Sequence, residues 1–206
     1  MRKIQDYYFK KAQKENYPAR SVYKLEEAQE KFQLMKKGDI ILDLGCQPGS
    51  WSMYAARIAG PTGLVVGVDL QQGKKVTVAR GAQIIWLRDD IMSDAIIGNL
   101  LEFRKSFQVI LSDMAPRTTG NKWVDQQQSL KLARRVSELA GELLEEGGNL
   151  YVKVFEGEDF KTFVESVRKK FKTVKIVKPK SSRKESREVF VLGLGFIKEG
   201  SRESNF

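Results

Sequence analysis

The stretch Phe107-Gln108-Val109-Ile110-Leu111-Ser112-Asp113-Met114-Ala115-Pro116 decides how this chain is expected to fold. Its first part is short, apolar and β-branched, which is typical of a buried parallel strand. Pro116 cannot donate to a strand ladder, so the chain is expected to leave the sheet just after Asp113. In an open α/β sheet, ligands bind beyond the carboxyl ends of the strands. Asp113 is therefore predicted to face a ligand, with helix capping as the alternative.

Outward from this stretch, short apolar runs alternate with amphipathic stretches, which predicts a parallel sheet with helices on both faces. The predicted strands are 40–44, 64–69, 83–87, 107–112, 149–155, 173–177 and 188–194. The predicted helices are 22–32, capped by Ser21, then 50–59, 93–104, 124–145 and 158–170. The polar connection between the last two strands is too short for a crossover helix, so the final strand is expected to be antiparallel.

The length of 206 residues fits a single domain, 1–206, with a basic arm at 1–20 and a flexible tail at 198–206. No apolar run approaches the roughly 18 residues that a membrane helix needs, and the N-terminus lacks the apolar core of a signal peptide. We therefore expect a cytoplasmic monomer without a membrane partner. The chain has one cysteine, no histidine and no EF-hand or Walker spacing of acids, so we expect no metal.

The net charge of +10 is concentrated near the two ends of the chain. Residues 1–24 hold seven Lys and Arg against two acids, and residues 168–187 hold ten against one. Such a local excess is the electrostatic signature of a polyanion partner, although solvated lysine faces are the alternative. Four aromatic residues lie in the N-terminal arm and are predicted either to stack on unpaired bases or to anchor the arm: Tyr7, Tyr8, Phe9 and Tyr17.

A glycine-containing loop follows the strand 40–44, in the order Gly45-Cys46-Gln47-Pro48-Gly49-Ser50-Trp51. Its glycines are four residues apart, whereas a dinucleotide site requires Gly-x-Gly-x-x-Gly. This spacing argues against NAD. The loop resembles instead the first motif of S-adenosylmethionine-dependent methyltransferases, an acidic strand end followed by glycines that allow close approach of a ligand.

Acidic side chains also end the second and third predicted strands. Asp69 is placed to accept both ribose hydroxyls of a nucleoside cofactor. Asp90 is suited to accept from an adenine amino group, and Asp89 is the competitor for that role. Helix or loop capping is the alternative for each of these acids.

Two ionisable residues in apolar strands stand out. Lys153 lies within Leu150-Tyr151-Val152-Lys153-Val154-Phe155, and burying an unpaired ammonium is costly, so it is expected either to pair with an acid or to act in catalysis. Glu188 opens the last strand. Lys24 lies on or near the face of the helix 22–32 that packs toward the domain.

With these residues in place, the chain closely resembles the FtsJ family of ribosomal RNA 2′-O-methyltransferases over nearly its whole length. The matching stretches are 19–25, 43–51, 112–116, 153–157, 178–183 and 186–188. The departures are Cys46-Gln47, where small residues are common, and a basic rather than apolar segment at 71–82.

The resemblance implies a Rossmann-like S-adenosylmethionine-dependent methyltransferase fold: an α/β, seven-stranded, mostly parallel sheet with an antiparallel last strand. It implies S-adenosylmethionine as cofactor. The implied catalytic tetrad is Lys24, Asp113, Lys153 and Glu188, with Lys153 as proton acceptor. The implied cofactor contacts are Gly45, Pro48, Gly49, Trp51, Asp69, Asp90 and Asp113.

The implied function is 2′-O-methylation of a ribose, that of a uridine, in large-subunit rRNA, with the assembled subunit as substrate and the basic segments contacting the RNA. A tRNA anticodon-loop ribose is the alternative substrate. A non-catalytic RNA-binding or ribosome-assembly factor is the alternative from another class. The intact tetrad argues against the latter, because binding alone does not require a lysine at that strand.

Overall fold

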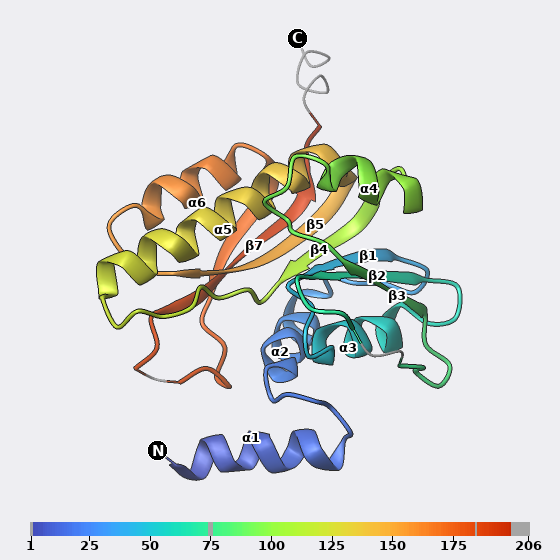
Figure 1. Ribbon diagram of the computed structural model, residues 1–206, viewed down its shortest axis with the longest axis horizontal. Helices are drawn as coiled ribbons and strands as arrows, with labels where there is room; N and C mark the ends of the chain where they lie inside the picture. The colour runs from blue at the N-terminus through green and yellow to red at the C-terminus, as the bar shows by residue number, and fades with distance from the viewer. Residues whose placement is uncertain (1, 74–75, 184, 199–206) are drawn as a thin grey trace.

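The fold is built on one mixed sheet, seen in the computed structural model, which describes residues 2–73, 76–183 and 185–198 (Figure 1). The seven strands lie in the order β3-β2-β1-β4-β5-β7-β6. Their bounds are β1 Ile40–Leu44, β2 Leu64–Asp69, β3 Gln83–Arg88, β4 Phe107–Ser112, β5 Leu144–Phe155, β6 Phe171–Val177 and β7 Glu188–Phe196. The order reverses at β1 and β4, and this reversal opens a crevice at the carboxyl ends of these two strands.

The sheet is parallel except at its last strand. β1 pairs in parallel with β2 and β4, and β4 pairs in parallel with β5. β7 is antiparallel to both β5 and β6, between which it is inserted. The predicted fold class, a mostly parallel seven-stranded sheet with an antiparallel last strand, is confirmed. The polar connection before β7 joins two antiparallel neighbours, as its length indicated.

Helices cover both faces of the sheet (Figure 1). Their bounds are α1 Arg2–Lys14, α2 Val22–Phe32, α3 Ser50–Ala59, α4 Ile96–Phe103, α5 Lys122–Leu143 and α6 Phe160–Arg168. One buried apolar cluster joins the sheet to α4, α5 and α6, and a second joins it to α2 and α3. The alternation along each strand explains the two clusters, because successive side chains point to opposite faces: Leu42 belongs to the first cluster and Ile41 to the second.

Several predicted element ends need correction. The helix expected at 93–104 begins at Ile96, because the Ser93 hydroxyl accepts from the Ala95 amide and holds a turn there. The helix expected at 124–145 ends at Leu143, because Leu144 already pairs with Phe107 at the start of β5. The other shifted ends are as follows: α4 ends at Phe103, α5 begins at Lys122, β3 ends at Arg88, β5 begins at Leu144, α6 is shorter than 158–170, β6 begins at Phe171 and β7 continues to Phe196.

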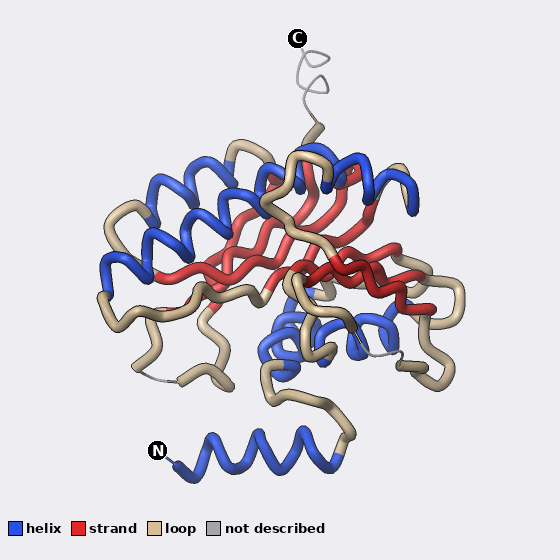
Figure 2. Tube along the Cα trace, viewed as in Figure 1, coloured by secondary structure: helices blue, strands red, loops and turns tan. Residues whose placement is uncertain are grey.

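The N-terminal arm is a helix, α1, that packs on α2 and stands apart from the sheet (Figure 2). Ala12 is buried against α2, and Lys11 forms an ion pair with Glu26 at 3.0 Å. Ser21 precedes α2 as predicted, but its side chain makes no capping hydrogen bond. The tail expected at 198–206 lies outside the described residues apart from Lys198. Among the helices that the structure describes, none is long and apolar enough to cross a membrane.

Candidate active site

A cavity of about 320 Å³ opens at the carboxyl ends of β1, β2 and β4. This volume is in the range of small-molecule sites. The cavity is lined by Gly45, Gln47, Val68, Asp69, Leu70, Asp89, Asp90, Ile91, Met92, Asp113, Met114, Ala115 and Leu132. Four predicted site residues therefore meet there: Gly45, Asp69, Asp90 and Asp113. Acids from three strand ends share one crevice because the carboxyl ends of parallel strands lie at the same edge of a sheet.

Gly45 allows the chain to turn at the end of β1. Its φ is +75°, and a Cβ at this position would lie 2.0 Å from Cγ of Met114. The Gly45 and Cys46 amides donate to the Val68 carbonyl, which fixes the loop against β2. A side chain at position 45 would both strain the backbone and fill the space beside Met114.

Asp69 is held at the end of β2 by two backbone amides. Its Oδ2 accepts from the Gln47 amide at 3.1 Å and its Oδ1 accepts from the Gln71 amide at 2.9 Å. The Gln47 side-chain Nε2 is buried and has no hydrogen-bond partner among the described residues. Sequence reasoning treated Gln47 only as a departure from the family pattern, yet it both positions Asp69 and lines the cavity.

The two acids after β3 differ in their partners. Asp89 Oδ2 accepts from Asn99 Nδ2 at 2.7 Å, and its Oδ1 accepts from the Asp90 amide. Asp90 is exposed, and its Oδ1 accepts from the Met92 amide. Asp89 therefore ties the loop to α4, whereas no hydrogen bond to Oδ2 of Asp90 is found among the described residues.

Three predicted cofactor contacts do not line this cavity: Pro48, Gly49 and Trp51. Trp51 is only 3 % exposed and stacks on Tyr151 with ring centroids 5.7 Å apart. Its Nε1 donates to the Ser21 carbonyl at 2.9 Å, which fixes the start of α2. Trp51 thus supports the helix that carries Lys24.

The four residues of the implied tetrad come together from α2, the end of β4, β5 and β7. Lys24 Nζ lies 3.3 Å from Asp113 Oδ1 and 2.9 Å from Glu188 Oε1. Lys153 Nζ lies 3.0 Å from the same Asp113 oxygen and also donates to the Asp113 carbonyl. Lys153 is 7 % exposed, so the acid beside it offsets the cost of burying its ammonium. Asp113 belongs both to this cluster and to the cavity wall.

Two carboxyl groups near the cluster have shifted pKa values in opposite directions. Burial acts to raise the pKa of Glu188, but the charge and hydrogen bond of Lys24, with help from the Ser182 hydroxyl, outweigh it and hold that pKa below its usual value. Burial raises the pKa of Asp43 to about 7, although the Ser52 hydroxyl donates to its Oδ2. Glu188 is therefore a stable anion, whereas Asp43 titrates near neutrality.

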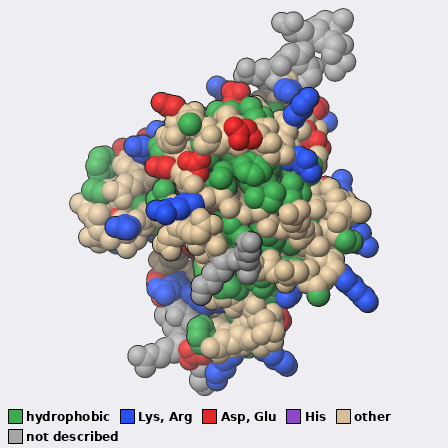
Figure 3. Space-filling view, turned by 45° about the vertical axis from the view of Figure 1, so that its right-hand side comes forward, with side chains coloured by type: hydrophobic (Ala, Val, Ile, Leu, Met, Phe, Trp, Pro, Cys, Tyr) green, Lys and Arg blue, Asp and Glu red, His purple; other side chains and the backbone are tan. Residues whose placement is uncertain are grey.

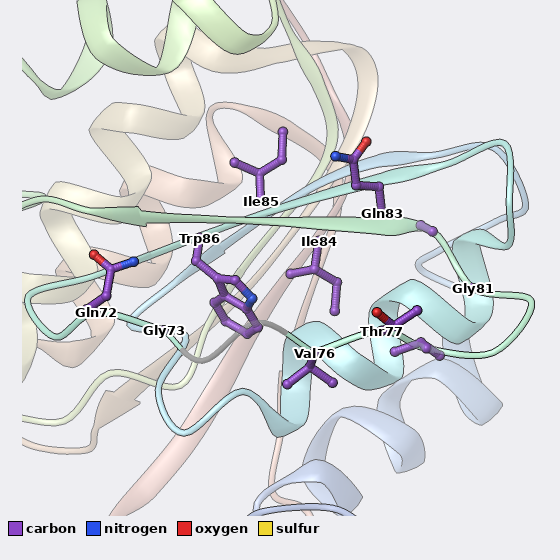
Figure 4. Close-up of a pocket in the computed structure, with 11 residues that line it drawn as sticks. Gln72, Gly73, Val76, Thr77, Gly81, Gln83, Ile84, Ile85 and Trp86 are labelled. Atoms are coloured by element: carbon purple, nitrogen blue, oxygen red, sulfur yellow. The ribbon is translucent and has the colours of Figure 1, made fainter.

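A larger cavity of about 630 Å³ lies beside β3, away from the tetrad (Figure 4). The Trp86 indole and the Ile84 side chain extend from the same side of β3, whereas Ile85 points to the other side of the strand (Figure 4). Among the described residues, its lining contains no ionisable side chain.

The described residues contain no group of three or more Cys, Asp or Glu side chains placed to hold a metal ion. The buried thiol of Cys46 stands alone, and burial raises its pKa.

Known proteins resemble this chain in sequence and in structure. Residues 17–196 match the model of the family described as FtsJ-like methyltransferase. A protein of Desulfotalea psychrophila named ribosomal RNA large subunit methyltransferase E is 56 % identical over 198 residues, covering 96 % of this chain and 98 % of the relative. A protein of the same name from Desulfosudis oleivorans is 47 % identical over 93 % of this chain and 91 % of its own.

Among solved structures, a ribosomal RNA methyltransferase described from Plasmodium falciparum superposes with a TM-score of 0.76 at 27 % identity, covering 88 % of this chain and 100 % of that one. A fibrillarin complex superposes with a TM-score of 0.58 at 17 % identity over 85 % and 83 % of the two chains, which shows likeness of fold alone. The sequence match spans the sheet, the acid-lined cavity and the whole tetrad, so this chain belongs to the FtsJ-like methyltransferase family.

Proposed function

We propose that this protein transfers a methyl group from S-adenosylmethionine to the 2′-hydroxyl of a uridine ribose in large-subunit rRNA, with the assembled subunit as substrate. The observation that carries this proposal is the position of Asp113, which is shared by the Lys24–Asp113–Lys153–Glu188 cluster and the acid-lined cavity. Because Asp113 is common to both, a methyl donor bound in the cavity would lie next to a ribose hydroxyl bound at Lys24 and Lys153. The names of the relatives at 56 % and 47 % identity support large-subunit rRNA as the substrate.

The residues of the cavity fit a nucleoside-containing methyl donor. Asp69 is fixed at a strand end where its oxygens can accept from ribose hydroxyls, and Asp90 has an oxygen available for an amino group. Apolar side chains of Ile91, Met92 and Leu132 line the same cavity and suit a flat base. The unpartnered Gln47 Nε2 supplies a further buried donor. The contacts predicted for Pro48, Gly49 and Trp51 would have to come from surfaces outside this cavity.

When bound, S-adenosylmethionine supplies an activated methyl group on a sulfonium. The O2′–CH₃ bond forms as the S–CH₃ bond breaks, with the electron pair leaving to sulfur, and the ribose O2′ proton must go to a base. Lys153 in its amine form accepts that proton in our proposal. Lys24 and Glu188, which are held together at 2.9 Å, orient the hydroxyl, and Asp113 fixes the Nζ atoms of both lysines. Holding oxygen and methyl group in line provides much of the rate.

Methyl transfer to defined RNAs tests this proposal. Labelled S-adenosylmethionine is mixed with the protein and with large subunits, free rRNA or tRNA from a strain lacking this activity, and the modified ribose is mapped by its resistance to alkaline cleavage. We expect label on a single large-subunit ribose. Label on tRNA alone would instead identify the anticodon-loop substrate. Bound cofactor with no label on any RNA would identify a non-catalytic RNA-binding factor.

A further inference from the structure

A second small cavity, of about 230 Å³, adjoins the tetrad and shares no lining residue with the cavity of about 320 Å³. It shares Lys24 and Glu188 with the tetrad, whereas the acid-lined cavity shares Asp113. The described residues that line it all carry charged or hydroxyl side chains: Arg20, Lys24, Ser181, Ser182, Arg183, Ser186 and Glu188. Its volume is below the ~300 Å³ that bounds typical small-molecule sites, which suits one group of a larger substrate.

The charge of this cavity favours an anion. Three cationic side chains line it against one carboxylate. That carboxylate, Glu188, already accepts from Lys24 and from the Ser182 hydroxyl at 2.8 Å, so its charge is compensated. The remaining Arg20 and Arg183 carry the fork of donors that matches phosphate oxygens.

One buried donor in the cavity has no partner. The Ser181 side chain is 4 % exposed, and its Oγ makes no hydrogen bond within the described residues. A buried hydroxyl without a partner is costly, and such groups are rare in folded proteins unless a ligand satisfies them. The hydroxyl therefore points to a ligand that accepts hydrogen bonds.

The loop that carries Ser181 is held in place before any ligand binds. The Lys180 and Ser181 amides donate to the two oxygens of Glu27 in α2, at 2.7 and 2.9 Å. Arg20, which precedes α2, reaches the Ser181 carbonyl at 3.5 Å. The same helix, α2, carries Lys24, so these hydrogen bonds tie one wall of the cavity to an element of the tetrad.

We infer that the cavity binds the RNA phosphodiester that flanks the target ribose, with Arg20, Ser181 and Arg183 as its ligands. This inference rests on the proposed function. In RNA a phosphodiester lies next to each ribose, so a ribose whose 2′-hydroxyl reacts at the tetrad brings a phosphate close to the tetrad. Ser181 and Arg183 are positioning residues: they hold the backbone so that the hydroxyl lies in line with the methyl group.

Binding of small phosphates tests the site without requiring turnover. Backbone amides of the isotopically labelled protein are followed by NMR while inorganic phosphate, uridine 3′-monophosphate, uridine 5′-monophosphate or uridine is added to millimolar concentrations. We expect shifts at Ser181, Ser182 and Ser186 with the phosphates but not with uridine. These shifts are expected to be lost in Ser181→Ala and Arg183→Ala and kept in Lys161→Ala, which removes an exposed charge that does not line the cavity.

Kinetics with large subunits tests the positioning role. At saturating cofactor, Ser181→Ala is expected to lower kcat/KM about tenfold or more, as for loss of a hydrogen bond to a charged group, with unchanged cofactor affinity and unchanged Tm. Lys161→Ala, at an exposed position of α6, serves as the control. Phosphate shifts without methyl transfer by the wild type would refute the proposed function alone. The absence of phosphate shifts, or equal kcat/KM for Ser181→Ala and wild type, would overturn the phosphate site.

Discussion

Asp113 connects the tetrad to the acid-lined cavity. Its Oδ1 forms ion pairs with the Nζ atoms of both tetrad lysines, and Asp113 also lines that cavity. Each lysine has a further partner: Glu188 for Lys24 and the Asp113 carbonyl for Lys153. Two lysines and two acids therefore offset one another in a partly buried place where an isolated charge would be costly. Because these charges compensate one another, two lysine side chains can lie close together at the position proposed for the substrate hydroxyl.

Replacing Lys153 separates catalysis from cofactor binding. Lys153→Ala is expected to reduce methyl transfer by about a hundred- to ten-thousandfold, the range of general base catalysis, while cofactor affinity by calorimetry stays near that of the wild type. Lys161→Ala on the exposed side of α6 is the control and is expected to retain full activity. Unchanged turnover in Lys153→Ala would show that another group receives the proton.

Asp89 and Asp90 are expected to respond differently to substitution. Asp90→Ala removes the acid with an available oxygen, so cofactor affinity should fall about tenfold at nearly constant Tm. Asp89→Ala breaks the bond to Asn99 and is expected to lower the Tm. Calorimetry and thermal melts on both variants check this. A larger loss of cofactor affinity in Asp89→Ala than in Asp90→Ala would reverse the assignment.

Asp43 gives the stability of the fold a pH dependence. Its pKa is about 7 in the folded protein against 3.8 for a free side chain, so the folded state holds a proton that the unfolded chain releases between these values. The resulting stabilisation is complete below pH 3.8 and is lost as the pH rises to about 7. Across this window, the unfolding free energy of the wild type should fall by up to about 4 kcal/mol relative to Asp43→Asn.

Urea unfolding of both proteins at a series of pH values measures this difference. Asp94→Asn, at an exposed position, is the control and is expected to follow the wild type. Parallel curves for Asp43→Asn and the wild type would mean that folding does not raise the pKa of Asp43.

At the scale of elements, the insertion of β7 between β5 and β6 completes the tetrad. β7 pairs with β5 so that Glu188 lies opposite Phe155 and Lys153 lies opposite Phe190. Glu188 and Lys153 are therefore diagonal neighbours on one face of the sheet. Because β7 is antiparallel to β5, it begins next to the carboxyl end of β5. Its first residue, Glu188, and not its last, therefore reaches the tetrad.

The aromatic residues of the N-terminal arm, 1–20, fall into two groups. Tyr8 packs against the Tyr23 ring at 5.2 Å, and Tyr17 is 6 % exposed, so both anchor the arm. Tyr7 and Phe9 are 61 % and 55 % exposed. The two roles predicted for these aromatic side chains thus apply to different residues. Tyr8 and Tyr17 anchor the arm, and stacking of Tyr7 and Phe9 on bases stays a prediction.

Substitutions in α1 test this division. Tyr7→Ala is expected to weaken binding to large subunits about tenfold without changing the Tm, since stacking on a base contributes on the order of 1–3 kcal/mol. Tyr8→Ala, its neighbour, is expected to lower the Tm because it removes the contact with Tyr23. Filter binding and thermal melts measure the two effects. Wild-type affinity in Tyr7→Ala would leave the exposed ring without a role in RNA binding.

At the scale of the whole molecule, charge is unevenly spread over the surface. Figure 3 shows lysine and arginine side chains dispersed over one face, with acidic side chains gathered mainly toward its top. The chain as a whole carries +10. A surface of this kind attracts a polyanion over several contacts at once, and each contact releases counterions.

Affinity for large subunits is therefore expected to fall steeply with salt. Lys14→Gln in α1 and Lys175→Gln in β6 should each reduce the slope of log affinity against log salt by about 0.9 if the side chain contacts a duplex phosphate. Lys105→Gln, in the loop before β4 at the opposite edge of the sheet from the tetrad, is the control. Equal slopes for all three variants and the wild type would place the RNA on another surface.

The sequence by itself determined the alternation of strands and helices, the antiparallel final strand and the strand ends at which Asp69, Asp90 and Asp113 lie. These features are local: periodicity, proline and glycine act within a few residues of the chain. The sequence also identified Lys153 and Glu188 as unusual, because an ionisable residue in an apolar strand is conspicuous without any knowledge of its partner.

Only the tertiary structure decided which of these residues meet. It placed β7 between β5 and β6, packed Trp51 against Tyr151 instead of in the cavity wall, and left the Ser181 hydroxyl buried beside Arg20. Each of these outcomes depends on contacts between segments many residues apart. Such contacts are selected by the joint packing of the whole core, which no local pattern of residues encodes.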